Sequence, residues 1–321
     1  MQGLMKAALA AWGCSMALAA TAQSEGSYPQ RPIQLVIPFA PGDTDQMLRP
    51  VVDKMPQYLK QPLVMNYKPG AGGGIGAAFV AAAAPDGYTL LGSSPGALVV
   101  VPQANKEAKY RSDSFRPVAA ISLGGMMIVV PAKSSYRSLK DLVADAKARP
   151  DMVSYGTSGA LGINHLLGEI FATEAGLQLR HIPFQGSTPA VTALLGGHTE
   201  AAISAIGPAR AHIEAGALRP LAVFSDKRMS AYPEVPTLRE LGYDIGSPAL
   251  YGLVAPAQTP TPVVDALYRA IRSVVDEHGP DVASTLQTMG AEIGLLGPQE
   301  YAAYLAHQEA LFARGLKMAG Q

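Results

Sequence analysis

Two neighbouring carboxylates are the first residues whose spacing could do chemistry. Asp43 and Asp45 follow the segment Ala40-Pro41-Gly42, at which the apolar run Ile33–Phe39 ends. Close carboxylates can split their pKa values and act as acid and base. No second catalytic group stands beside them, and an aspartate at a helix start accepts backbone N–H bonds. We therefore expect Asp45 to cap a helix over 45–59 rather than to catalyse a reaction.

A serine offers the second possible chemistry. Ser94 lies in the segment "GSSPG", which follows an apolar run and matches the G-x-S-x-G pattern of hydrolases. The oxyanion hole of such an enzyme needs the backbone N–H of the residue after the nucleophile. Here that residue is Pro95, which has no N–H. We favour a polar loop at a strand end and no catalytic residue, with a secreted α/β hydrolase that uses Ser94 as the competing hypothesis.

The glycine-rich stretch "GAGGGIGA" begins at Gly70 and resembles a dinucleotide-binding turn. Its glycines permit close backbone approach and leave N–H groups at the start of a helix predicted from Ile75, an end that attracts anions. A tight turn without a ligand explains the glycines equally well. We predict no cofactor.

The N-terminus resembles a secretory signal peptide over residues 1–22. One lysine and no acid precede the apolar run Ala7–Ala20, which is too short to span a bilayer, and Ala20 to Ala22 form a small-x-small cleavage pattern. Cleavage would remove Cys14 and Trp12, leaving no thiol for a disulfide or a metal.

Charge and histidine spacing exclude further classes of function. Lys and Arg total 25, against 25 Asp and Glu, which argues against a nucleic-acid partner or a polybasic membrane surface. None of the histidines forms an i, i+4 pair on a predicted helix or joins a carboxylate cluster, so we predict no metal site.

Short apolar runs alternate with helical patterns along the chain, which predicts an α/β fold with doubly wound parallel sheets. Two stretches, "MMIVVPAKSSYRSL" and "SPALYGLVAPAQTP", look like crossings between lobes. They divide the mature chain into lobe 1, residues 23–125 and 254–321, and lobe 2, residues 126–253. At a length of about 300 residues, two domains are expected.

Several loops after predicted strands are rich in glycine, hydroxyls or proline. The stretches "YGTSGALGINHLLGE" and "FQGSTPAVTALLGG" repeat the order of strand, small polar loop and helix. Ligands of open α/β sheets bind at such carboxyl ends of strands. Two lobes that each present these loops predict a cleft that closes on a small molecule.

Long stretches, among them "YPQRPIQLVIPFAPG", "QPLVMNYKPGAGGGIGAAFVAAAAPDGYTLL" and "HIPFQGSTPAVTALLGG", occur in the order typical of one family. The chain resembles the Bug family, the periplasmic solute-binding receptors of tripartite tricarboxylate transporters. The resemblance implies two Rossmann-like lobes joined by two crossing strands, with the flytrap architecture of periplasmic binding proteins. It also implies a small organic carboxylate as ligand, a membrane permease as partner and a monomer in the periplasm. A receptor that signals through a partner protein is a further alternative.

The resemblance also implies which residues bind the ligand, mainly through loop N–H groups and hydroxyls. The matching positions are Phe39, Ala40, Pro41, Gly42, Asp45, Ser93, Ser94, Thr157, Ser158, Gly159, His165, Gln185, Gly186, Ser187 and Ser204.

Two positions depart from the family pattern. The first loop, "PGDTD", is one residue short and carries the extra acid Asp43, and Leu250 stands where the family often has Trp. An added carboxylate would repel a dianion. We hypothesise that Asp43 points away from the ligand or shifts preference toward a mono-anion, a zwitterion or a neutral molecule.

Overall fold

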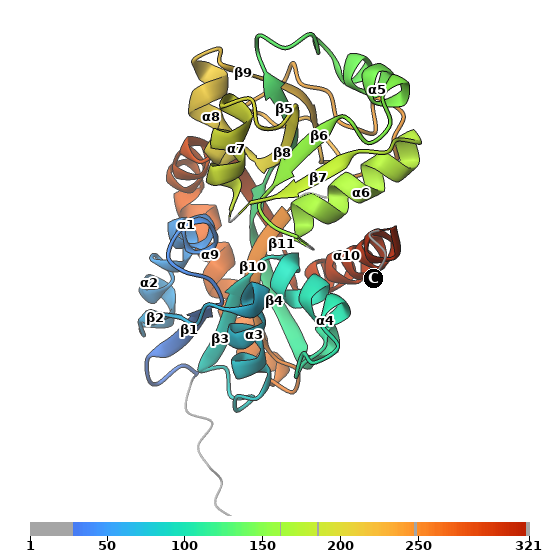
Figure 1. Cartoon of the computed structure of the whole chain (residues 1–321). Helices are drawn as coiled ribbons and strands as arrows, with labels where there is room; N and C mark the ends of the chain where they lie inside the picture. Colours follow the sequence, from blue (N-terminus) through green and yellow to red (C-terminus); the bar gives the residue numbers. More distant parts are fainter. Residues whose placement is uncertain (1–27, 161, 185, 247–248, 319–321) are drawn as a thin grey trace, which may run out of the picture.

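The chain forms two lobes, each built on one β-sheet (Figure 1). The computed structural model describes residues 28–160, 162–184, 186–246 and 249–318, so the predicted signal peptide lies outside the described residues. In the described part, no helix has the length and apolar character needed to cross a membrane.

The lower lobe in Figure 1 contains a six-stranded sheet in the order β11-β4-β10-β3-β1-β2. Its strands are β1 (Ile33–Ile37), β2 (Leu63–Tyr67), β3 (Thr89–Ser93), β4 (Phe115–Gly124), β10 (Ala249–Pro256) and β11 (Ala291–Leu296). Its helices are α1 (Asp43–Val52), α2 (Pro56–Leu59), η1 (Ala71–Gly73), α3 (Gly74–Ala81), η2 (Gly96–Val100), α4 (Val101–Ala104), η3 (Ser112–Ser114), α9 (Thr261–Thr288) and α10 (Pro298–Met318).

The upper lobe contains a five-stranded sheet in the order β7-β6-β8-β5-β9. Its strands are β5 (Met126–Pro131), β6 (Ser154–Thr157), β7 (Arg180–Pro183), β8 (Ala201–Ala205) and β9 (Leu218–Val223). Its helices are α5 (Leu139–Ala148), α6 (Ile163–Ala175), α7 (Ser187–Leu195) and α8 (Ile206–Glu214).

Both sheets are mixed, which corrects the prediction of parallel sheets. Strand β1 pairs in parallel with β2 and β3, and β6 pairs in parallel with β7 and β8. In contrast, β10 is antiparallel to β3 and β4, and β5 is antiparallel to β8 and β9. The antiparallel strands include those through which the chain leaves and re-enters each lobe. A strand that returns beside its neighbour in this way needs no helical crossover.

Gly125 separates β4 from β5 and marks the first passage between the lobes. The return passage lies between β9 and β10, and β10 is paired with the lower sheet from Ala249 onward. A side chain at Gly125 would collide with Ile206 of α8, and so would one at Gly290 before β11, so the absence of these Cβ atoms lets the two lobes approach closely here.

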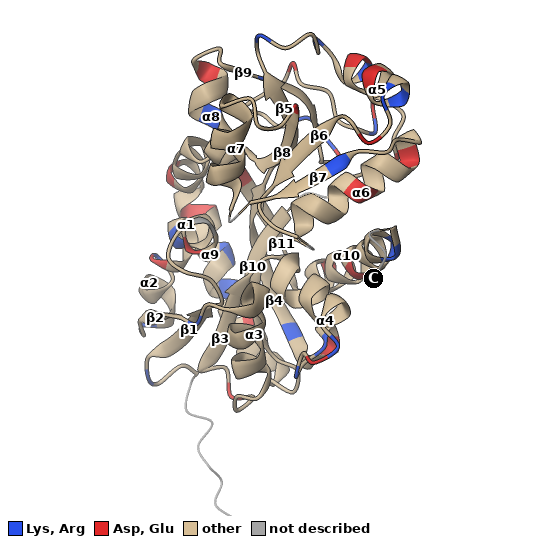
Figure 2. Ribbon diagram, in the orientation of Figure 1, with Lys and Arg blue, Asp and Glu red and all other residues tan. Residues whose placement is uncertain are grey.

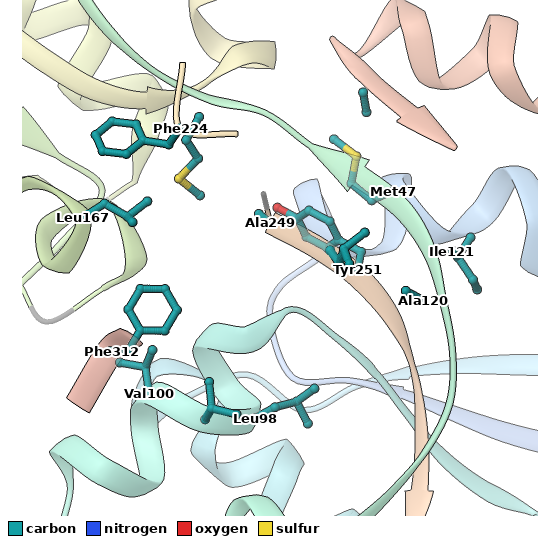
Figure 3. Packing of buried hydrophobic residues seen from close by; sticks show 14 of the residues in the cluster. Met47, Leu98, Val100, Ala120, Ile121, Leu167, Phe224, Ala249, Tyr251 and Phe312 are labelled. Carbon is teal, nitrogen blue, oxygen red and sulfur yellow. The ribbon is translucent and has the colours of Figure 1, made fainter. Parts of the chain in front are cut away.

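The C-terminal helix α10 joins the lobes on another side. A methyl group at Gly315 would lie 3.2 Å from Ile170 Cδ1 of α6, and Arg314 pairs with Glu174 of α6 at 3.0 Å. Figure 3 shows Phe312 of α10 near Leu167 of α6, both within one buried apolar cluster. Apolar burial therefore holds the lobes together beside the predicted cleft.

Candidate ligand-binding site between the lobes

Asp45 fixes the loop after β1. Helix α1 begins at Asp43, so Asp45 is its third residue rather than the residue before it, and its Oδ1 accepts the N–H of Gly42 at 2.6 Å. Its Oδ2 accepts the Tyr67 hydroxyl at 3.0 Å and lies 3.4 Å from Arg49 Nε. Burial alone would raise the pKa of Asp45, but these donors together hold the pKa below its usual value. Asp45 therefore accepts a backbone N–H at the helix start as predicted, but from the third helical position, since Gly42 and not Asp45 is the N-cap. Both of its carboxylate oxygens are bound by groups of the protein itself.

Phe39 connects this loop to the glycine-rich turn. A methyl group at Gly73, where φ is +96°, would lie 3.0 Å from Phe39 Cζ and 2.7 Å from Ala97 Cβ. The turn therefore serves close packing of three loops, as only glycine permits. Ala40 and Pro41 are exposed beside it. Asp43 is the first residue of α1, and its side chain lies outside the described structure.

Ser93 ends β3, Ser94 follows it, and both are buried. The Ser93 hydroxyl donates to the Ser94 carbonyl at 3.2 Å, and a helix follows directly, with a π-helical turn over Gly96–Val100. Among the described residues, no hydrogen bond joins Ser94 Oγ to a histidine. A nucleophilic serine needs such a base within hydrogen-bond reach.

The loop after β6 is fastened to the loop after β7. The N–H of Phe184 donates to the Thr157 carbonyl at 3.0 Å, and that of Gly186 donates to the Ser158 carbonyl at 3.1 Å. Gly159 and Gly186 have φ values of +152° and +120°, which suit glycine. The structure therefore brings these four predicted residues of lobe 2 together.

Ser187 is the first residue of α7 and half-buried, next to Gly186. Gln185 lies outside the described residues.

Asn164, which the sequence reading missed, connects this loop to β8. Its Oδ1 accepts the Ser158 hydroxyl at 3.1 Å, and its Nδ2 donates to the Ile203 carbonyl at 2.9 Å. The neighbouring Ser204 is fully buried and donates to the Ala205 carbonyl at 2.9 Å. A polar amide in the first turn of a predicted helix was the signal that could have identified Asn164.

His165 faces its own lobe. Its Nε2 lies 3.4 Å from Glu169 Oε1, and its ring stacks on His181 with 3.8 Å between centroids. Glu169 also accepts the Tyr155 hydroxyl at 2.7 Å. Across the described residues, no group of three or more His, Cys, Asp or Glu side chains could hold a metal ion.

The two sets of loops meet where η2 approaches α6. A methyl group at Gly96 would lie 3.4 Å from Ile163 Cδ1, the first residue of α6. Both segments lack charged side chains, and Figure 2 shows the start of α6 without blue or red. Neutral N–H groups and hydroxyls are therefore the main polar groups at this junction.

The passage at Gly125 leaves little space beside it. A cavity of about 10 Å³ there is lined by Met47, Ile206 and Tyr251 among others, which is room for one water molecule at most. The Tyr251 side chain lines this cavity. The preceding residue, Leu250, lies against β11, because a methyl group placed at Gly294 of that strand would lie 2.6 Å from Leu250 Cδ2. Leu250 therefore packs over β11, and Tyr251 is the aromatic side chain of β10 at the lobe boundary.

These lobes, passages and strand-end loops are those of a two-lobed solute-binding protein. The family described as TctC, the tripartite tricarboxylate transporter family receptor, matches residues 47–317, and the chain belongs to it. The predicted family is confirmed. Its members are periplasmic solute-binding receptors and not enzymes, so the Ser94 hydrolase hypothesis is wrong.

Individual relatives agree over most of their length. The protein BugT of Bordetella pertussis is 35% identical, with 89% of this chain and 88% of BugT covered. A solved R. palustris structure with adipate has 29% identity and a TM-score of 0.79, covering 91% of this chain and 98% of that one. The Rhodopseudomonas palustris protein MatC with bound malate has 26% identity and a TM-score of 0.75, covering 90% and 99%.

Proposed function

We propose that this chain captures a small organic carboxylate between its lobes in the periplasm and delivers it to the membrane permease of a tripartite tricarboxylate transporter. The observation that carries the proposal is the close approach of Gly96 in one lobe to Ile163 in the other. A methyl group placed at Gly96 would lie 3.4 Å from Ile163 Cδ1. Gly96 follows the Ser93–Ser94 strand end, and Ile163 follows the loop that holds Ser158. The relatives solved with adipate and malate support a carboxylate as the ligand.

The binding chemistry follows from the donors at this junction. Helix α6 begins at Ile163 with a glycine before it, and α7 begins at Ser187 with Gly186 before it. The first N–H groups of a helix lack intrahelical partners and carry partial positive charge. Such fixed dipoles, with the nearby hydroxyls, would hold a carboxylate without an arginine and with little reorganisation.

Further parts of the proposal concern the whole chain. We propose that residues 1–22 are removed as a signal peptide and that the mature receptor is a monomer. Since β10 pairs with the lower sheet from Ala249, we place the end of lobe 2 before that residue rather than at 253.

A thermal-shift screen of residues 23–321 tests the proposal. The panel contains adipate, malate, citrate, benzoate and amino acids. A ligand at one hundred times its Kd stabilises the folded state by about 2.7 kcal/mol through mass action, which raises the melting temperature. A shift with at least one carboxylate, confirmed by calorimetric titration, is the expected result. The absence of a shift with every member of the panel would contradict the proposal.

A further inference from the structure

Five polar side chains gather on one face of the lobe 2 sheet, three from its strands and two from helix α6. Tyr155 of β6 lies opposite His181 of β7 in the parallel register, and Thr157 follows two positions later on the same face. Helix α6 covers this face with His165 and Glu169, which are spaced i, i+4. His181 is therefore enclosed by side chains from both β6 and α6.

His181 contacts the binding loop directly. Its Nε2 lies 2.7 Å from the hydroxyl oxygen of Thr157, and its ring is stacked on His165 at an interplanar angle of 15°. Thr157 is fully buried. The stack and the hydrogen bond together leave the His181 ring little freedom to turn.

The hydrogen bonds of Thr157 indicate which ring nitrogen of His181 carries the proton. The Thr157 hydroxyl has one proton, and it donates that proton to the Gly159 carbonyl at 3.1 Å. With this proton on Gly159, we assign the 2.7 Å bond to the Nε2–H of His181, which is the tautomer that satisfies both bonds. Burial, followed by nearby His165, lowers the pKa of His181 to about 4 against the opposing effect of Glu169, so the ring is neutral at pH 7.

We propose that His181 is a positioning residue of the ligand site. Through its Nε2–H it orients the Thr157 hydroxyl, which in turn holds Gly159 and the loop on the lobe 2 side of the site. The effect on ligand affinity rests on the proposed function, whereas the effect on the loop does not. His181 touches no residue of lobe 1 in the contacts described, so its action is confined to the lobe 2 loop.

Two variants separate the hydrogen bond from the ring. His181→Phe keeps an aromatic ring for stacking and removes the bond to Thr157. His181→Gln offers an amide N–H near the position of Nε2 and cannot be protonated. His198→Phe, at an exposed position on the same lobe, is the matched control.

The first readout needs no ligand. Amide hydrogen exchange is measured by NMR at Phe184 and Gly186, whose N–H groups bond to the Thr157 and Ser158 carbonyls. Loss of one hydrogen bond predicts an increase of about fivefold to tenfold in exchange for His181→Phe, with rates near the parent for His181→Gln and His198→Phe. Parent-like exchange in His181→Phe would overturn the proposal.

A measurement on the parent protein keeps the proposal testable if His181→Phe does not fold. Nitrogen NMR of the imidazole reports which ring nitrogen carries the proton. We expect the neutral Nε2–H tautomer for His181 at pH 7. An Nδ1–H tautomer, or a ring that is charged at pH 7, would overturn the assignment.

The second readout is the affinity for adipate and malate by calorimetric titration. Whichever of the two acids the parent binds more tightly, we expect His181→Phe to bind it at least fivefold more weakly than the parent does. The affinity of His181→Gln should equal that of the parent or lie between those of the parent and His181→Phe. Equal affinity of parent and His181→Phe would overturn the role in binding. If the parent binds neither acid nor any carboxylate of the screen, the proposed function fails, and the exchange experiment still decides the role of His181 in the loop.

Discussion

Gly96 and Ile163 belong to different lobes and lie so close that a methyl group at Gly96 would contact Ile163 Cδ1 at 3.4 Å. Gly96 starts the π-helical turn after β3, and Ile163 starts α6. Helix starts from both lobes are thereby brought to one junction, which is the geometry that a closing receptor needs.

The first prediction is that a bulky residue at Gly96 blocks closure. Gly96→Phe would force the lobes apart and weaken ligand binding at least tenfold, whereas Gly96→Ala keeps an ordinary contact distance and stays within about threefold of the parent. Calorimetric titration with a carboxylate from the screen measures both. Gly279→Phe, at a helical glycine with open space around it, is the control. Unchanged affinity in Gly96→Phe would show that the junction does not close on the ligand.

The second prediction concerns the capping carboxylate. Asp45→Ala removes the acceptor of the Gly42 N–H and of the Tyr67 hydroxyl and should lower the free energy of unfolding by about 1–3 kcal/mol. Urea unfolding measures the change. The control is Asp53→Asn, which breaks an exposed pair with Arg49 at 3.6 Å and should cost less than about 0.5 kcal/mol. Equal losses in the two variants would contradict the capping role.

The third prediction is a loss of stability in mild acid. The pKa of His181 is about 4 in the folded protein, below its ordinary value of 6.5. Between these values the unfolded chain binds more protons, so the free energy of unfolding falls as the pH drops from 6.5 to 4. Since His181 is only partly buried, we expect a loss of about 1 kcal/mol from this group.

Thermal unfolding at pH 7.0, 6.0, 5.0 and 4.5, roughly spanning this window, checks the loss. His181→Gln should show a shallower decline in melting temperature than the parent. An identical decline in both proteins would assign the acid sensitivity to other groups.

The fourth prediction concerns Asp43, the extra acid at the start of α1. If its charge disfavours dianions, Asp43→Gly should raise affinity for dicarboxylates relative to monocarboxylates by about threefold or more. Parallel titrations with one acid of each kind give the ratio. Glu107→Gly, an exposed acid in lobe 1, is the control. The same ratio in parent and Asp43→Gly would reject the hypothesis.

Local chemistry was predictable where the signal lay within a few residues. The segment "SLKDL" predicts a capping box at Ser138, and Ser138 does cap α5, with its hydroxyl accepting the Asp141 N–H at 3.3 Å. The helix predicted over 45–59 is instead two helices, because Pro56 starts a second one. The sequence pattern did not predict a strand over Phe115–Gly124, the residues of β4, because Pro117 lies within it and proline is uncommon inside a sheet.

Tertiary contacts explain what the sequence could not show. The sequence pattern from Thr261 predicts a helix that ends at Glu277. Helix α9 instead continues to Thr288 after a kink at His278, since Val282 and Leu286 are buried in the core. Likewise, Asn164 and His181 act through partners far away in sequence, Ile203 and Thr157. Family resemblance identified the loops, but only the folded chain shows which side chains hold them.

The most direct test is the crystal structure of residues 23–321 with the tightest-binding carboxylate from the screen. We expect the carboxylate between the lobes, with its oxygens within hydrogen-bond distance of the Ser93–Gly96 segment of lobe 1 and of the Ser158 or Gly186 loop of lobe 2. A carboxylate bound to one lobe alone, on a surface that the other lobe does not reach, would contradict the account.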